Sequence, residues 1–197
     1  MAVYKIVDLD AWADGQIRSK LWLVQELEQI VNDIFFKPVN IWNLAGWYGQ
    51  TAFLFFIRSH INIEKWRSFD VDPSCEVISE SINNVWLIEE WKFKAITADI
   101  NEINYATPWN YYSPDPDIII NTSCEHMTST SWFNNIPNEK LVVLQSTNMD
   151  HSDHYLKAQS IDEFKEQFPL ARYFYADEIE IKYKTWSFKR FMIIGEK

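Results

Sequence analysis

The feature that most constrains the fold is an alternation of short apolar segments with amphipathic ones, repeated five times along the chain. The apolar segments are rich in β-branched and aromatic residues, and one of them, residues 117–121, has the sequence DIIIN. A continuous apolar run of this kind is typical of a strand that is buried on both faces of a parallel sheet. Strands that alternate with helices therefore predict an α/β fold with a mostly parallel sheet.

The alternating part predicts strands over residues 39–45, 65–71, 93–98, 117–121 and 141–144. Helices are expected over residues 50–60, from Pro73 onward with Asp72 as the cap, and over residues 125–135 and 161–168. Two long segments, 171–183 and 186–195, close the chain and are separated only by Lys184 and Thr185, which indicates a hairpin. We therefore predict a Rossmann-like, mostly parallel seven-stranded sheet with helices on both faces and a C-terminal antiparallel β-hairpin.

Before the first strand, apolar residues recur at steps of three and four, as on one face of a helix. They are Ile17, Leu21, Val24, Leu27, Val31 and Ile34. We expect a helix that Asp10 caps and that ends near Phe35. A chain of 197 residues is expected to form one domain, 1–197, with residues 1–36 as a helical segment packed on it.

Charge and cysteine usage narrow the function classes. The formal net charge is −10, which repels phosphate backbones and makes duplex nucleic acid an unlikely partner. The two cysteines, Cys75 and Cys124, are isolated and suit a reducing cytoplasmic compartment. The first residues do not resemble a signal peptide, and no apolar run approaches the roughly 18 residues that span a bilayer. We expect a cytoplasmic protein without a membrane partner; the sequence does not specify its oligomeric state.

A glycine-bearing turn follows the first expected strand. The segment 43–49 has the sequence NLAGWYG and holds two of the four glycines of the chain. Glycine permits a close approach of backbone and ligand, and the following helix N-terminus attracts anionic groups. An ordinary tight turn explains the same residues.

Acidic residues follow the next two expected strands. Asp70 lies about 20 residues after the glycine turn, where a carboxylate can accept hydrogen bonds from both hydroxyl groups of a ribose. Asp72 is better explained as a helix cap. Asp99 can accept a hydrogen bond from an adenine amino group, and its neighbour Ile100 can lie against the ring. A solvated loop acid is the alternative for Asp99.

Together these segments resemble class I S-adenosylmethionine (SAM)-dependent methyltransferases, from about Val39 to the end of the chain. The sequence is also similar to small phage-encoded methyltransferase-like proteins. The resemblance implies SAM as cofactor, held by the glycine loop, by the acids after the second and third strands and by the end of the fourth. The implied cofactor-binding residues are Asn43, Ala45, Gly46, Trp47, Gly49, Asp70, Val71, Asp99, Ile100 and Asn121. Asn43 replaces the family's acid, and Ala45 and Trp47 stand where glycines are usual.

The function implied is methyl transfer from SAM to a small-molecule or unidentified acceptor. Glu125 and His126 follow the fourth expected strand and are the candidate catalytic residues, able to orient an acceptor or take its proton. Alternatively, Glu125 only favours a helix N-terminus. The altered glycine loop keeps two other functions open: a SAM-binding protein that is not a methyltransferase, either SAM-cleaving or non-catalytic, and an interaction module without cofactor. A nicotinamide dehydrogenase is less favoured, because GxGxxG is absent.

Two further groups of residues are potential ligands. Cys124, His126, His151 and His154 are of the types that bind zinc, but their spacing is loose and we expect no metal. Aromatic residues in or near the expected rim loops could contact the cationic sulfonium group of SAM or stack on a planar acceptor. These are Trp47, Tyr48, Trp109, Tyr111 and Tyr112.

Overall fold

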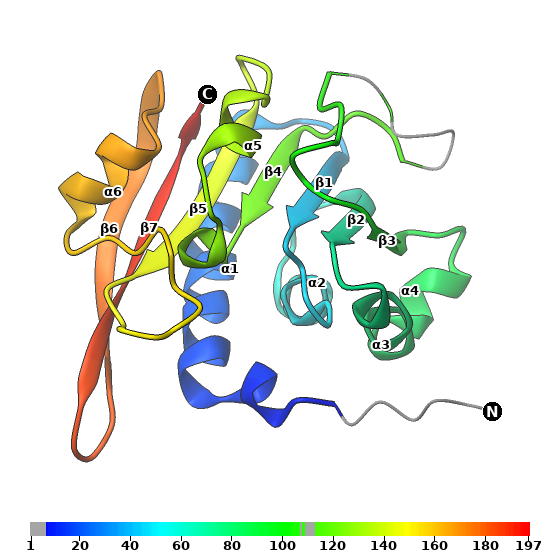
Figure 1. Ribbon diagram of the computed structural model, residues 1–197. Coiled ribbons are helices and arrows are strands. Elements are labelled where there is room, and N and C mark those ends of the chain that lie inside the picture. The colour runs from blue at the N-terminus through cyan, green and yellow to red at the C-terminus, as the bar shows by residue number, and fades with distance from the viewer. Residues whose placement is uncertain (1–6, 107, 109–112) are drawn as a thin grey trace.

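The computed structural model describes residues 7–106, 108 and 113–197 and has a single seven-stranded sheet at its centre (Figure 1). The strands are β1 (Val39–Leu44), β2 (Ile63–Asp70), β3 (Phe93–Thr97), β4 (Ile118–Asn121), β5 (Leu141–Thr147), β6 (Arg172–Lys182) and β7 (Ser187–Glu196). Their spatial order is β3-β2-β1-β4-β5-β7-β6. The order reverses between β1 and β4, so the carboxyl ends of these strands form the place where α/β sheets bind ligands.

The predicted pairing is confirmed. Strands β1 to β5 are all parallel, and β7 runs antiparallel to both β5 and β6. The shortest of them, β4, is fully buried at the centre, in keeping with its uninterrupted isoleucines. The terminal hairpin extends well beyond the parallel strands in Figure 1 and stands beside the N-terminal helix.

Helices cover both faces of the sheet. The α-helices are α1 (Asp14–Ile34), α2 (Gln50–Arg58), α3 (Pro73–Ile82), α4 (Asn84–Ile88), α5 (Ser131–Asn134) and α6 (Ile161–Gln167), and two 3-10 helices are η1 (Leu9–Trp12) and η2 (Cys124–His126). On one face, residues of α1 and α2 join the strands in one buried cluster, and on the other face residues of α5 and α6 join them in a second.

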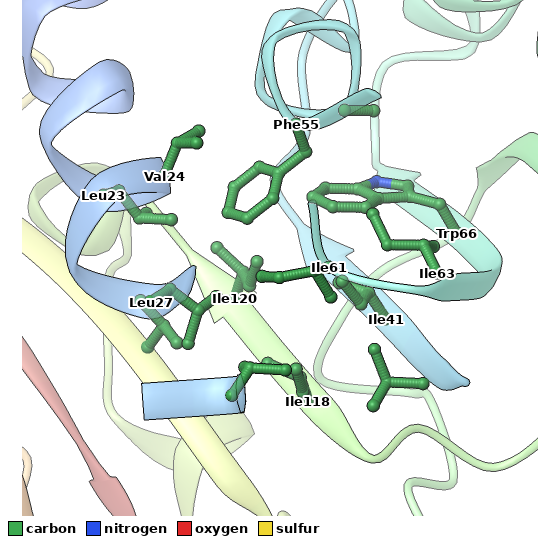
Figure 2. Packing of buried hydrophobic residues seen from close by; sticks show 14 of the residues in the cluster. Leu23, Val24, Leu27, Ile41, Phe55, Ile61, Ile63, Trp66, Ile118 and Ile120 are labelled. Atoms are coloured by element: carbon green, nitrogen blue, oxygen red, sulfur yellow. The ribbon is translucent and has the colours of Figure 1, made fainter. Parts of the chain in front are cut away.

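Figure 2 shows the first of these clusters. Leu23 and Leu27 of α1 and Phe55 of α2 point toward Ile118 and Ile120 of β4. All five side chains are essentially inaccessible to solvent. Burial of each such side chain stabilises the fold by about 1.5–3 kcal/mol. The i, i+4 stripe of α1 is therefore what attaches the N-terminal helix to the sheet.

Three local expectations were wrong. The cap Asp10 lies inside η1, which Asp8 caps instead, and α1 begins only at Asp14 after Ala13. The helix expected over residues 125–135 is divided into η2 and α5, because serine and threonine side chains compete for the backbone there; the hydroxyl of Ser129 accepts from the backbone N–H of Ser131. Helix α4 was not predicted, and none of its residues is buried.

Other boundaries agree within a few residues. Asp72 caps α3 as predicted, with its carboxylate accepting from the backbone N–H of Ser74 at 2.9 Å. In the part of the chain that the structure describes, no helix combines the length and the hydropathy needed to cross a membrane.

Candidate functional site

The first cleft lies at the carboxyl ends of the parallel strands and has a volume of about 210 Å³. Its wall is built from the end of β2 and from the segments that come after β1, β2, β3 and β4 in the chain. They are Ala45, Asp70, Val71, Ala98, Asp99, Ile100, Asn101, His126, Met127, Thr128 and Ser129. Six of the candidate site residues from the sequence are thus brought together around one cleft: Ala45, Asp70, Val71, Asp99, Ile100 and His126.

Asp70, at the end of β2, organises the turn after β1. One of its carboxylate oxygens accepts from the backbone N–H of Trp47 at 2.8 Å and the other from that of Asp72 at 3.0 Å. Partial burial raises the pKa of Asp70, and the two backbone N–H groups oppose this effect. A carboxylate has about four lone-pair sites, so Asp70 retains capacity for hydroxyl donors from the cleft.

The glycine-bearing turn is shaped by packing and by positive φ angles. Gly49 has φ +73°, where a side chain would be strained, and a Cβ at Gly46 would lie 1.9 Å from the hydroxyl oxygen of Ser68, so Ser68 would have to move. Ala45 and Trp47 adopt φ 48° and 49° without being glycine. Strained non-glycine residues of this kind cluster at ligand sites. Of these four residues only Ala45 lines the first cleft.

The two predicted asparagines lie buried at the neighbouring ends of β1 and β4. Asn43 pairs in register with Ile120, one residue before Asn121. Among the described residues, the Oδ1 atom of Asn43 and the Nδ2 atom of Asn121 have no hydrogen-bond partner, and both atoms are buried. Asn43 and Asn121 are not part of the wall of the first cleft, and neither are Gly46, Trp47 and Gly49.

The residues after β3 supply the opposite wall. The carboxylate of Asp99 accepts from the backbone N–H and the side-chain amide of Asn101, at 2.8 and 2.9 Å. Ile100 is buried beside it, whereas Val71 is exposed. Sequence reasoning missed Ala98, Asn101 and the stretch from Met127 to Ser129, although their positions after β3 and β4 could have indicated them.

A second cleft, of about 390 Å³, lies between the loops after β4 and β5, the terminal hairpin and the start of α1. Its wall consists of Asp10, Ala13, Gly15, Gln16, Glu125, His126, Met149, His151, His154, Tyr183, Trp186, Phe188 and Arg190. His126 lines both clefts, whereas Glu125 lines only the second. The sequence pattern identified Glu125, His126, His151 and His154 as candidates, but neither Met149 nor the hairpin residues of this wall.

Three aromatic rings of the hairpin form one side of the second cleft. The rings of Tyr183 and Trp186 stack with centroids 4.5 Å apart, and those of Trp186 and Phe188 with centroids 5.5 Å apart. The hydroxyl of Tyr183 accepts from the backbone N–H of Gly15 at 3.2 Å, which ties the hairpin to α1. Trp186 remains half exposed at the edge of this cleft.

A cluster of buried charged side chains borders the second cleft, and Glu125 and Arg190 belong to its wall. Arg190 of β7 donates to Oε1 of Glu125 at 2.5 Å and to the carbonyl of Thr122 at 2.9 Å. Lys20 of α1 is also buried and donates to the side chain of Gln16 at 2.7 Å. Burial and the nearby Arg190 lower the pKa of Lys20 to about 7, against the opposing effect of Glu125.

The histidine rings in the second cleft have defined hydrogen bonds. Nδ1 of His126 lies 3.1 Å from the carbonyl of Asp153, and Nδ1 of His154 lies 2.8 Å from the carbonyl of Met149. Since a carbonyl only accepts, both Nδ1 atoms donate, and in the neutral form of each ring Nε2 keeps a lone pair. Shielding by the surrounding protein lowers the pKa of His126, which favours the neutral ring; Glu125 opposes this shift.

Two other groups of predicted residues are not in the clefts. Cys124 is fully buried, its Sγ lies 3.6 Å from the carbonyl of Asn121, and burial raises the pKa of its thiol. Trp47 and Tyr48 contact each other, with ring centroids 5.1 Å apart. The remaining predicted aromatic residues, Trp109, Tyr111 and Tyr112, lie outside the described residues.

The fold is shared with known structures, although no protein-family model and no curated protein matches the sequence. The chain superposes on the YcgJ protein of Bacillus subtilis with a TM-score of 0.61 at 11% identity, over 88% of this chain and 98% of that one. It superposes on magnesium protoporphyrin IX methyltransferase of Synechocystis, solved with bound SAM, with a TM-score of 0.61 at 7% identity, over 98% of this chain and 88% of that one. On phosphoethanolamine N-methyltransferase 2 of Haemonchus contortus it superposes with a TM-score of 0.57 at 10% identity, over 98% of this chain and 61% of that one. By its strand order and these superpositions, the chain has the fold of class I SAM-dependent methyltransferases.

Proposed function

We propose that this protein binds SAM in the first cleft and transfers its methyl group to a small molecule held in the second. The observation that carries the proposal is the position of His126, which lines both clefts. A methyl donor in the first cleft and an acceptor in the second would meet beside this ring. Methyl transfer needs mainly alignment of the two reactants and exclusion of water.

The nucleoside of SAM fits the chemistry of the first cleft. Asp70 and the exposed Val71 would contact the ribose, and Asp99 and the buried Ile100 the adenine. The strained Ala45 borders the same space. Asn43, Gly46, Trp47, Gly49 and Asn121 do not line the cleft and would act indirectly, by shaping the turn after β1 and the end of β4.

The acceptor side favours a planar small molecule. The half-exposed Trp186 offers a ring face, and the acidic chain disfavours a duplex nucleic acid. Glu125 and His126 are the candidate catalytic residues: His126 can orient the acceptor through its free Nε2 atom or accept its proton, and Glu125 borders the acceptor space.

The first test is SAM binding by calorimetry with the variant Asp70→Ala. Loss of hydrogen bonds to a charged group should weaken binding by about 1.5–3 kcal/mol, or roughly 10- to 150-fold. Asp72→Asn is the matched control, because asparagine also caps helices and Asp72 does not line the first cleft. Equal affinities in the wild type and Asp70→Ala would remove Asp70 from the ribose role, and absence of SAM binding in the wild type would overturn the proposal.

The second test is product analysis by mass spectrometry. A methyltransferase forms S-adenosylhomocysteine only when an acceptor is present, and a panel of planar aromatic alcohols and amines would serve as acceptor probes. Consumption of SAM in the absence of an acceptor would identify a SAM-cleaving enzyme instead. Binding of SAM without turnover on any probe would favour the non-catalytic binder.

A third test separates catalysis from structure at Glu125 and His126. In single-turnover transfer at saturating SAM, Glu125→Gln and His126→Asn should lower the rate while SAM affinity stays nearly unchanged. A positioned proton acceptor contributes about 10²–10⁴-fold. Unchanged rates in both variants would contradict the catalytic assignment but not the transfer of methyl groups, which can rest on alignment alone.

A further inference from the structure

Three potential metal ligands converge in the second cleft. Glu125, His126 and His154 each offer a ligand atom, and these atoms lie within 4.8 Å of one another. The two imidazole rings meet edge to face, with centroids 4.7 Å apart. Zinc–nitrogen bonds are about 2.0–2.1 Å long, so a small rotation of the rings would bring the three donors to one ion.

Both histidines are prepared as ligands by their other nitrogen. Nδ1 of His126 donates to the carbonyl of Asp153, and Nδ1 of His154 donates to that of Met149. A carbonyl that accepts from the second ring nitrogen fixes the tautomer and orientation of metal-binding histidines in general. The two Nε2 atoms are therefore left with the lone pairs that a metal ion requires.

The carboxylate of Glu125 supplies an independent observation. Its side chain is only 3% exposed, and Arg190 occupies Oε1. Within the part of the chain that the structure describes, Oε2 has no hydrogen-bond partner, although the atom is buried and the residue lines the second cleft. A buried carboxylate oxygen without a partner is costly, and a cation would satisfy it.

The neighbouring residues of similar type do not belong to this set. The thiol of Cys124 is directed at the carbonyl of Asn121. Nδ1 of His151 accepts from the backbone N–H of Asp153 at 3.3 Å, so its neutral ring carries the proton on Nε2. The arrangement thus differs from the Cys-His-His-His combination in the sequence, for which we expected no metal, because Glu125 takes the place of the cysteine.

We propose that Glu125, His126 and His154 form a three-ligand site for a divalent transition-metal ion, with its remaining coordination positions open to the second cleft. Two imidazoles and one carboxylate suit zinc or iron rather than magnesium or calcium, which prefer oxygen ligands only. The charged groups that face the cluster are Arg190 and Lys20, which weaken the binding of a cation, and Asp10 in the cleft wall.

The link to methyl transfer rests on the proposed function, whereas the metal site does not. A bound ion would occupy Nε2 of His126, so this ring could not act as a proton acceptor at the same time. The open coordination positions of the ion could instead hold an oxygen of the acceptor. The ion would then ease the loss of the acceptor's proton, as metal ions do for bound water.

The test is a titration of the tag-free full-length chain with Co²⁺, followed by visible absorption, and with Zn²⁺ in competition with a chromophoric chelator. The wild type should bind one equivalent, with the absorption of a coordinated cobalt ion. His154→Asn and Glu125→Gln should each lower the affinity by about 100-fold or more, beyond the 10- to 100-fold that supporting residues contribute. An excess of Mg²⁺ should not displace the ion.

Matched controls are available among the other histidines. His60→Asn removes a ring that contacts Glu28 beside the opposite ends of the strands, and His151→Asn removes one in the second cleft; both variants should bind like the wild type. Circular dichroism checks that His154→Asn, a substitution in a loop, is folded. The proposal is overturned if the wild type does not saturate at one equivalent, if both ligand variants bind normally, or if Mg²⁺ competes. SAM binding, measured without metal, reports separately on the proposed function.

Discussion

The two clefts at the carboxyl ends of the strands are built in different ways. The first is lined by the end of β2 and by the segments that come after β1, β2, β3 and β4 in the chain, and its carboxylates accept hydrogen bonds from nearby backbone N–H groups. The second brings together α1, the loops after β4 and β5, and the terminal hairpin. Its wall includes the buried pair of Glu125 and Arg190, and the buried Lys20 lies near this pair.

This difference separates a general part of the molecule from a particular one. Any chain with this strand order brings the carboxyl ends of its strands together at the place of the first cleft. The set of residues that line this cleft therefore changes little when the helices shift slightly. The second cleft depends on contacts between segments that are far apart in the sequence, such as Glu125 and Arg190, 65 residues apart. Its buried charges therefore make the second cleft sensitive to changes in distant parts of the sequence, and this contrast between the two clefts can be tested.

The largest effect is expected at Arg190. Arg190→Met should lower the free energy of unfolding by about 3–5 kcal/mol, because it leaves the buried Glu125 carboxylate without its charged partner. The double variant Glu125→Leu, Arg190→Met should recover most of the loss, since no buried charge then remains. Urea denaturation measures both. An equal loss in the single and double variants would show that packing, and not charge, makes Arg190 important.

The next effect is the pH dependence that Lys20 introduces. In the folded protein the pKa of Lys20 is about 7 instead of 10.5, so below pH 7 the folded state holds a buried charge. Between pH 7 and about 10 the folded state has lost this proton while the unfolded chain still holds it. The free energy of unfolding therefore rises with pH over this range. Lys20→Met should therefore stabilise the protein more at pH 6 than at pH 9, by about 2–3 kcal/mol. Urea denaturation of both proteins at the two pH values measures this; an equal gain at both would mean that Lys20 is not held with a lowered pKa.

A smaller effect separates the two neighbouring acids beside the first cleft. Asp72→Ala should lower the free energy of unfolding by about 1 kcal/mol, because it removes the N-cap of α3, yet leave SAM affinity unchanged. Asp72→Asn should retain the stability. Thermal unfolding and calorimetry provide the two measurements, and a loss of SAM affinity in Asp72→Ala alone would move the ribose contact from Asp70 to the cap.

The smallest effect is expected on the aromatic side of the second cleft. Trp186→Ala should lower kcat/KM for a planar acceptor by about 2- to 10-fold, the value of one ring contact, without changing SAM affinity. Trp91→Ala is the control, because Trp91 is similarly exposed but lines a different cavity, beside the start of β2. The contrast between the clefts would fail if Trp186→Ala weakened SAM and acceptor alike.

Local sequence patterns predicted part of the first cleft, although they missed Ala98, Asn101 and the stretch from Met127 to Ser129. The isoleucines of β4 and the cap at Asp72 predicted the parallel sheet and the strand ends, and the structure brings Ala45, Asp70, Val71, Asp99 and Ile100 together there. The errors were local. Asp10 and Asp8 are equally good cap residues, and a short stretch such as η2 to α5 is set by hydrogen bonds that compete at similar energy.

What the sequence by itself determined is the order of the elements and the residues that follow each strand, because hydrophobic period and turn residues act over a few positions. Only the tertiary structure decided that Arg190 pairs with Glu125, that Lys20 is buried near both, and that Glu125 replaces Cys124 beside His126 and His154. These contacts join β7, α1 and two loops, and their geometry follows from the packing of the whole sheet. No local pattern carries that information, since the same residues in solvent would be ordinary surface charges.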